Sequence, residues 1–310
     1  MSNFKIWMAQ IRANFLVLAV FLVIIGLAFS LKYPSTPGQS FSFFHAILLI
    51  IGVVLSHVSV NLFNEYSDFK TKIDFYTKRT PFSGGSGMIT GGKTKPGAVR
   101  IVGICSLLVA FAIGMYFTII AHWIIIVISL TGLFSILFYT NFLAKHFLGE
   151  MFAGLALGTL VVIGAYIAMT ASPGMPLTKL LPEEVIWVSI PPGILTSLLL
   201  FINQFPDIEA DKLGGRRHLV IILGWKRASY VYAAGMLLTF VIIVLCPIIG
   251  ISSFWIYLAL LPLPLAVKAS ITAIKFGNDT AKLITALGSN VITVLATDFL
   301  LAVAVFIDVI

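Results

Sequence analysis

Residues 13–31 read ANFLVLAVFLVIIGLAFSL, an apolar run of about the length that a helix needs to cross a bilayer, roughly 20 residues. Lys5 and Arg12 precede the run, as basic residues precede a secretory signal. The run is longer than the apolar core of a signal peptide, however, and no small-residue cleavage site follows it. We therefore interpret it as a membrane helix that is retained.

The rest of the chain has the same character. Its 310 residues are 59% hydrophobic and 10% charged, whereas soluble domains carry about 25% charged residues. Polar breaks separate nine apolar segments, and the alternating pattern of an outer-membrane barrel is missing. The sequence predicts an all-α polytopic membrane protein, with nine transmembrane helices in a single domain, residues 1–310. The expected spans lie near residues 13–31, 43–64, 98–118, 121–141, 148–170, 185–206, 228–248, 252–268 and 286–307.

The basic residues indicate the orientation. If the N-terminus is cytoplasmic, all of the 20 Lys and Arg residues except Lys32 and Lys179 fall in cytoplasmic segments. The positive-inside rule then predicts a cytoplasmic N-terminus and an external C-terminus. Topology and attraction to anionic lipid explain the net charge of +8, so no nucleic-acid partner is implied.

Half of the 12 acidic residues lie in two short segments on the predicted cytoplasmic side. Each segment follows the second span of a set of four, so spans 1–4 and 5–8 are candidate copies of one unit. The loops that hold them, residues 65–97 and 207–227, are the most polar parts of the chain. The acidic residues are Glu65, Asp68 and Asp74 in the first loop and Asp207, Glu209 and Asp211 in the second.

The polar residues before and within these segments have helical spacing. A helix through the first segment would align residues at i, i+4, i+7 and i+11 on one face, namely His57, Asn61, Asn64 and Asp68. Asp74 can join that face only if the helix ends or bends first. The second segment repeats the pattern at i, i+4 and i+8 with Asn203, Asp207 and Asp211, and Pro206 is expected to interrupt its helix.

Carboxylates gathered at a membrane boundary repel one another unless a cation holds them. Mg²⁺ suits this set, because it prefers oxygen ligands and usually binds one or two carboxylates together with substrate phosphates. Basic residues in the same loops can complete the charge balance around a diphosphate. They are Lys70, Lys72, Lys78, Arg79, Arg216 and Arg217. The alternative is that all of these are solvated loop charges of a transporter or scaffold.

A glycine-rich run, residues 80–87, reads TPFSGGSG. Its small residues can let backbone N–H groups approach phosphate. The run lacks the Lys-Ser/Thr ending of a nucleotide P-loop, so ATP is not implied. A flexible loop that closes over the site is the equal alternative.

These residues resemble the UbiA superfamily of intramembrane prenyltransferases. The first aspartate motif of that family is matched by Asn64-Glu65-Tyr66-Ser67-Asp68 with Asp74, and the second by Asp207 and Asp211. Glu65 departs from the usual Asp. The segments Phe138-Tyr139-Thr140 and Gly149-Glu150, and the gap between Asp68 and Asp74, are similar to the menaquinone-pathway branch.

The resemblance implies a helical bundle around a central cavity that is open to lipid for an isoprenoid tail. It further implies two Mg²⁺ ions, held by Asn64 and the four aspartates, that bind the diphosphate of a prenyl donor. Tyr139 is expected in the wall around the allylic cation, Lys145 at the diphosphate and Asn203 beside the metals. The expected reaction is prenylation of an aromatic acceptor, 1,4-dihydroxy-2-naphthoate, at the cytoplasmic side of a prokaryotic plasma membrane. No obligatory protein partner is implied.

Two alternatives remain open. One is a UbiA-type enzyme with another acceptor, such as 4-hydroxybenzoate, a porphyrin, a glyceryl phosphate or a carotenoid. The other is a transporter, which is expected to place carboxylates near the bilayer midplane. Asp298, within the last span, is the acidic residue that fits this second alternative.

Overall fold

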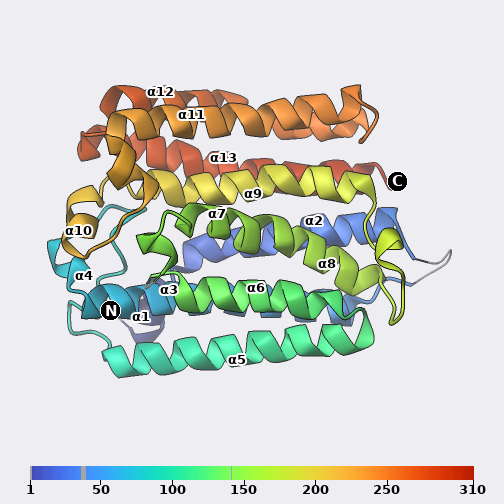
Figure 1. The fold of residues 1–310 in the computed structure, drawn as a ribbon, viewed down its shortest axis with the longest axis horizontal. Helices are drawn as coiled ribbons and strands as arrows, with labels where there is room; N and C mark the ends of the chain where they lie inside the picture. The colour runs from blue at the N-terminus through green and yellow to red at the C-terminus, as the bar shows by residue number, and fades with distance from the viewer. Residues whose placement is uncertain (1, 36–39, 141) are drawn as a thin grey trace.

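The computed structural model describes residues 2–35, 40–140 and 142–310, and every regular element within these ranges is a helix (Figure 1). Seven helices in the described part of the chain are long and apolar enough to cross a membrane. This confirms an all-α polytopic membrane protein. The seven are η1 with α2 (Ala13–Lys32), α3 (Phe43–Lys70), α5 (Pro96–Ile120), α7 through α8 (Gly149–Thr170), α9 (Glu183–Asn203), α11 (Leu219–Ile248) and α13 (Thr280–Ile307).

The other two predicted spans are less regular. Helix η5 (Phe254–Leu260) and helix α12 (Leu263–Phe276) form a pair bent by 41°, which makes an eighth crossing if it counts as one span. Helix α6 (Ile124–Phe138) has only 15 residues, and the predicted end of its span at residue 141 lies outside the described residues. The count of nine therefore stays a prediction.

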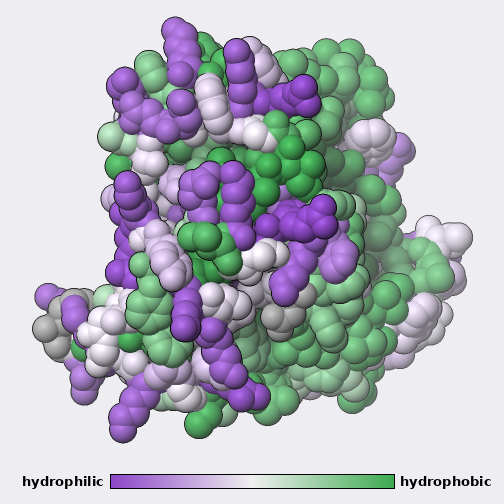
Figure 2. All heavy atoms as spheres, turned by 60° about the vertical axis from the view of Figure 1, so that its left-hand side comes forward, coloured by the Kyte–Doolittle hydropathy of each residue, from purple (hydrophilic) through white to green (hydrophobic). Residues whose placement is uncertain are grey.

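The functional segments gather at one end of the bundle. The N-terminus, α1 (Asn3–Gln10), α4 (Ile73–Tyr76) and α10 (Ile208–Leu213) lie at the left in Figure 1, and the C-terminus lies at the opposite end. Hydrophilic side chains are concentrated at the same left-hand end, while the flank of the bundle is mostly hydrophobic (Figure 2). The two carboxylate segments therefore share one polar end of an otherwise apolar bundle.

Close packing of small residues sets the position of α9. A Cβ atom on Gly158 would lie 2.7 Å from the Cα of Gly193, and one on Gly154 would lie 2.6 Å from the Gly193 carbonyl oxygen. Small residues at such contacts let membrane helices approach backbone to backbone. The segment from α7 to α8 thereby holds α9, whose C-terminal end carries Asn203, against the site.

The end without the motifs is closed by an ion cluster. The Lys32 ammonium lies 2.6 Å from the Glu184 carboxylate and also pairs with Asp308, and the Tyr33 hydroxyl donates to Glu184 at 2.5 Å. These contacts join the end of α2, the start of α9 and the end of α13. Lys32, one of the two lysines not assigned to cytoplasmic segments, thus has a packing role at that end.

Candidate active site

A cavity of about 210 Å³ lies between the two carboxylate segments. Residues of both segments line it, together with Tyr139 and part of the glycine-rich run. The structure therefore brings the two segments, which are more than a hundred residues apart in sequence, to one site. The expected site residues at this cavity are Asn64, Asp68, Asp74, Tyr139, Asn203, Asp207 and Asp211.

The end of α3 shapes the first half of the site. The four residues at helical spacing, His57, Asn61, Asn64 and Asp68, all line the cavity, as the periodicity predicts. Helix α3 then ends at Lys70, and Lys72 adopts a left-handed conformation with φ of 62°. This break turns the chain back, so Asp74 in α4 reaches the cavity that it would miss on a continued helix.

The break after α9 shapes the second half. Helix α9 ends at Asn203, and Pro206 lies in the turn before Asp207, the N-cap residue of α10. Proline lacks the N–H that a continued helix would require. The interruption predicted at Pro206 is confirmed, and Asp207 and Asp211 both line the cavity.

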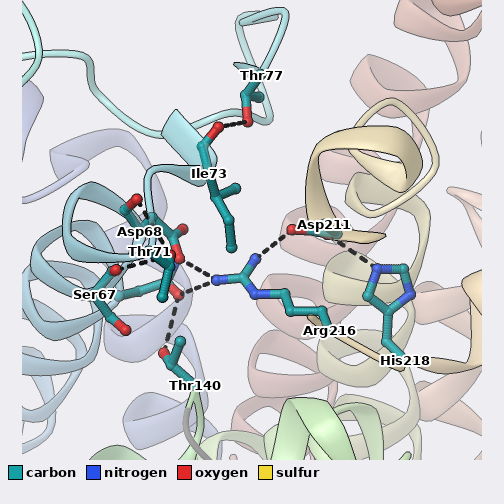
Figure 3. Close-up of polar contacts among 10 residues, drawn as sticks. Ser67, Asp68, Thr71, Ile73, Thr77, Thr140, Asp211, Arg216 and His218 are labelled. Atoms are coloured by element: carbon teal, nitrogen blue, oxygen red, sulfur yellow. Dashed lines mark hydrogen bonds and ion pairs between the residues drawn. The ribbon is translucent and has the colours of Figure 1, made fainter. Parts of the chain in front are cut away.

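Arg216 bridges the two halves (Figure 3). Its guanidinium donates to Asp68 of the first segment and, at 2.8 Å, to Asp211 of the second. It also donates to the Asn64 side-chain oxygen at 3.3 Å, an atom that Thr140 contacts at 3.4 Å. The guanidinium therefore supplies part of the positive charge that the gathered carboxylates need, as expected for a basic residue of these loops.

Asp211 has a second polar neighbour. His218 Nε2 lies 3.0 Å from its other carboxylate oxygen, and both side chains are almost fully buried. Burial alone raises the pKa of Asp211, but Arg216 and the His218 hydrogen bond outweigh it and hold that pKa below the usual range. The sequence placed Arg216 in the correct loop, yet nothing in its spacing identified either Arg216 or His218 as a partner of the aspartates.

Asp74 and Asp207 behave in the opposite way. Burial, with the charge of Asp68 adding to it, raises the pKa of Asp74 to about 7. Burial also raises the pKa of Asp207 to about 7, with Asp211 as the neighbouring negative charge. Carboxylates that are buried with few partners lose their hydration without gaining compensation. These two groups are therefore available to an added cation.

The oxygen atoms at the cavity fit Mg²⁺. Oδ2 of Asp74, Oδ1 of Asp207 and Oδ1 of Asn203 are buried without a hydrogen-bond partner, and all three residues line the cavity. Within the described residues, no three His, Cys, Asp or Glu side chains are grouped closely enough to hold a metal ion by themselves. That is the arrangement expected when each ion takes one or two carboxylates and completes its shell with substrate phosphate and water.

The glycine-rich run covers part of the cavity. Ser83, Gly84 and Gly85 line it, and both glycines have positive φ, at 85° and 72°. A Cβ on Gly85 would lie 3.0 Å from Oδ1 of Asp74, so a side chain there would crowd that carboxylate. Glu65 does not line the cavity; it accepts hydrogen bonds from the backbone and side chain of Ser86 and ties the run to α3.

Three expected diphosphate ligands lie elsewhere. Lys72, Arg79 and Lys145 are exposed, and none of them lines the cavity. Arg79 instead donates to Thr90 at 2.5 Å. Sequence proximity to a motif did not distinguish these cations from Arg12, which does line the cavity and which sequence reasoning missed.

A second cavity, of about 140 Å³, adjoins the first and is mostly apolar. It lies among α3, α5, α6 and the segment from η3 (Leu155–Thr159) to α8 (Leu160–Thr170). His57, Ile136 and Leu157 line both cavities, so the apolar space begins where the carboxylate site ends. A ligand with a charged head and a hydrocarbon tail suits this pair of cavities.

Comparison with known proteins agrees with this geometry. The model of the UbiA prenyltransferase family matches residues 19–291. This chain belongs to the UbiA prenyltransferase family. A 1,4-dihydroxy-2-naphthoate octaprenyltransferase of Bacillus subtilis is 30% identical over 230 residues, covering 72% of this chain and 70% of the relative. An enzyme of the same name from Haemophilus influenzae is 26% identical over 276 residues, which cover 87% of this chain and 86% of the relative.

Solved structures of UbiA homologues share the fold. The apo homologue from Aeropyrum pernix superposes with a TM-score of 0.64 at 15% identity, over 96% of this chain and 98% of the homologue. The homologue from Archaeoglobus fulgidus, determined with DMAPP and Mg²⁺ bound, gives 0.58 at 15% identity, over 97% and 98%. The predicted family, fold class and enzyme class are thus confirmed.

Proposed function

We propose that this prenyltransferase moves a polyprenyl group from a prenyl diphosphate to 1,4-dihydroxy-2-naphthoate. One observation carries the reaction type: two carboxylate segments line a cavity that lies next to a mostly apolar one, and the two share His57, Ile136 and Leu157 as lining residues. The diphosphate lies at the carboxylates and the isoprenoid tail in the apolar cavity. The acceptor assignment is supported by the Bacillus subtilis relative, which carries that name.

Asp68, Asp74, Asp207 and Asp211, with Asn64, are the proposed ligands for two Mg²⁺ ions. Bound there, Mg²⁺ would neutralise the negative charge that grows on the diphosphate as it leaves. The unpartnered oxygens of Asp74 and Asp207 support this assignment, as does the Mg²⁺ bound to the Archaeoglobus fulgidus homologue. Asn203, whose side-chain oxygen is also unpartnered, completes the ligand shell or orients it.

The chain's own residues then act by position and by exclusion of water. The allylic carbon–oxygen bond breaks and diphosphate leaves with the electron pair. The naphthoate ring carbon that bears the carboxylate bonds to the allylic carbon, and loss of CO₂ returns an electron pair to the ring. Tyr139 lines this cavity, so its ring face can stabilise the allylic cation.

His57 is the proposed contact for a ring hydroxyl of the acceptor. Its Nδ1 lies 3.1 Å from the Val53 carbonyl oxygen, which can only accept, so Nδ1 carries the ring proton. Its Nε2 is buried without a partner and is the nitrogen that can accept a hydrogen bond from a hydroxyl. Asn61, the alternative on the same helix face, already donates its amide to the Ile11 carbonyl at 3.0 Å. An acceptor ring whose hydroxyl meets His57 would lie between the carboxylate cavity and the apolar cavity.

The orientation belongs to the same proposal. The carboxylate site lies on the cytoplasmic side of a prokaryotic plasma membrane, and the N-terminus lies on that side as well. The distribution of lysine and arginine supports this assignment.

The two carboxylate-bearing halves, spans 1–4 and 5–8, are proposed as copies of one unit within a single domain.

A competition assay tests the acceptor. Purified protein with Mg²⁺ and one prenyl diphosphate receives equal amounts of 1,4-dihydroxy-2-naphthoate, 4-hydroxybenzoate and a glyceryl phosphate, and the products are identified by mass. We expect the bicyclic acid to be prenylated preferentially, with loss of 44 mass units as CO₂. Equal or better turnover of the single-ring acid, or of a glyceryl phosphate, would contradict the acceptor assignment and leave prenyl transfer intact.

A further inference from the structure

Arg12 occupies a backbone conformation that residues other than glycine, asparagine and aspartate rarely adopt. It joins α1 to η1 (Ala13–Phe15) with φ of 53° and ψ of 51°, in the left-handed region. Such an outlier persists only where its surroundings fix it, and outliers of this kind cluster at functional sites.

The two residues before Arg12 are held by other parts of the chain. The Asn61 amide donates to the Ile11 carbonyl at 3.0 Å, and the Thr94 hydroxyl donates to the Gln10 side-chain oxygen at 2.6 Å. Gln10 is fully buried. Helix α3 and the loop before α5 thus hold the backbone turn at Arg12 through Gln10 and Ile11. Neither hydrogen bond involves the Arg12 side chain.

The Arg12 side chain lies between two cavities. It lines the carboxylate cavity and also a third one, of about 300 Å³, formed by α1, η1 and the glycine-rich run from Thr80 to Ser86. Ser83 and Gly85 line both of these spaces too. The third cavity therefore adjoins the site, and it shares no lining residue with the apolar cavity that suits the tail.

The charges at the cavity leave Arg12 available. Of the two arginines among the described lining residues, Arg216 is engaged by Asp68 and Asp211, whereas Arg12 has no carboxylate within 4.0 Å. A guanidinium that lines the cavity and pairs with none of its carboxylates keeps its N–H donors for a further group.

We propose that Arg12 is an anion-binding residue of the active site, which binds the phosphate or carboxylate oxygens of a substrate at the opening between α1 and the glycine-rich run. The inference deepens the proposed function and rests on it. Both substrates of that reaction carry such oxygens, the prenyl donor as a diphosphate and the acceptor as an aryl acid. Arginine binds either one through paired N–H donors.

The test separates charge from backbone conformation. Arg12→Asn removes the guanidinium but tolerates the left-handed conformation, as does Arg12→Gly, and Arg12→Lys retains the charge. Lys5→Asn is the matched control, because Lys5 lies exposed on the adjacent α1 and lines none of the three cavities. Calorimetry on each protein in detergent measures binding of inorganic pyrophosphate with Mg²⁺ and, separately, of 1-hydroxy-2-naphthoate. Thermal melting reports folding.

We expect Arg12→Asn and Arg12→Gly to weaken at least one probe by tenfold or more at an unchanged melting temperature, with Arg12→Lys recovering part of the affinity. Weaker pyrophosphate binding identifies the diphosphate as the anion, and weaker naphthoate binding identifies the acceptor acid. Unchanged affinity for both probes overturns the inference. A loss of binding that Lys5→Asn reproduces also overturns it. The same holds if binding is lost only together with a fall in melting temperature that Arg12→Lys shows as well. A wild-type protein that binds no pyrophosphate at any Mg²⁺ concentration refutes the proposed function itself.

Discussion

Asp207 and Glu209 stand two residues apart in one segment, yet only Asp207 lines the cavity. Glu209 is exposed and pairs with Lys212 at 2.9 Å, a contact of little energetic weight at the surface. We expect Asp207→Asn to lower the rate of prenyl transfer by about 10²–10³, the range for loss of one preorganised electrostatic contact. Glu209→Gln should leave the rate within twofold. Because burial disfavours the Asp207 charge, the metal-free Asp207→Asn protein should melt no earlier than wild type.

Arg216 holds two carboxylates that would otherwise face each other. Removing one partner from a buried ion pair typically costs about 3–5 kcal/mol, because the remaining charge is left uncompensated. Arg216→Gln should therefore lower the melting temperature in EDTA strongly, and Mg²⁺ should restore more stability to this variant than to wild type. Arg217→Gln, at the exposed neighbouring position, is the control. Equal melting of both variants in EDTA would show that the bridge contributes nothing.

The raised pKa values of Asp74 and Asp207 predict how cation binding changes with pH. Both carboxyls have a pKa of about 7 in the folded protein, against about 3.9 in an unfolded chain. Between these values the folded metal-free protein binds more protons, so the contribution of the two groups to its stability falls as pH rises from about 4 to about 7. Protons compete with Mg²⁺ over the same range.

The half-saturating Mg²⁺ concentration should accordingly rise as pH falls below about 7. Each proton that Mg²⁺ displaces raises the half-saturating Mg²⁺ concentration by up to about tenfold for each unit that the pH falls. Titrations at pH 6, 7 and 8, followed by pyrophosphate binding, measure this. A half-saturating concentration that is constant from pH 6 to 8 would mean that neither carboxyl titrates at the cation site.

At the scale of the elements, periodicity predicted the faces of helices but not the contacts between loops. The spacing from His57 to Asp68 placed four side chains on one face, and Pro206 marked the break in the second segment. Lys72 and Arg12 both adopt a left-handed backbone conformation, which neither residue type predicts. The sequence therefore did not predict that Lys72 would lie outside the cavity and Arg12 would line it. Arg216 reaches Asp68 across 148 positions, a pairing that only the tertiary structure reveals.

Helix α6 offers a test of the apolar cavity. Gly132 lines it, and a Cβ at this position would meet no atom within 4 Å, so a larger side chain enters open space without moving the backbone. We expect Gly132→Leu to shorten the longest prenyl diphosphate that is accepted while short donors keep their rate. Mass analysis of products from a donor mixture measures this. Gly97 is an equally open, exposed position at the start of α5 and does not line the cavity, so Gly97→Leu should not change the distribution.

At the scale of the whole molecule, composition was sufficient for the fold class but not for the crossing count. Mean hydropathy separates a helical membrane bundle from a soluble protein, whereas the number of spans depends on how α6 and the bent pair of η5 and α12 lie in the bilayer. The two ends of the bundle differ clearly, with the carboxylate site and the N-terminus at one end and the Lys32 cluster at the other (Figure 1).

That difference makes the orientation testable with single cysteines. Lys212 is exposed on α10 at the carboxylate end, and Lys179 is exposed in η4 (Leu177–Lys179) on the connection between α8 and α9, at the other end. In a background with Cys105 and Cys246 replaced by serine, Lys179→Cys should react with a membrane-impermeant maleimide in intact cells. Lys212→Cys should react only in inverted vesicles, because the positive-inside rule places its loop in the cytoplasm. Reaction of Lys212→Cys in intact cells would show that the site lies on the external side of the membrane, without altering its chemistry. Labelling of both variants from one side would contradict a membrane crossing between α8 and α10.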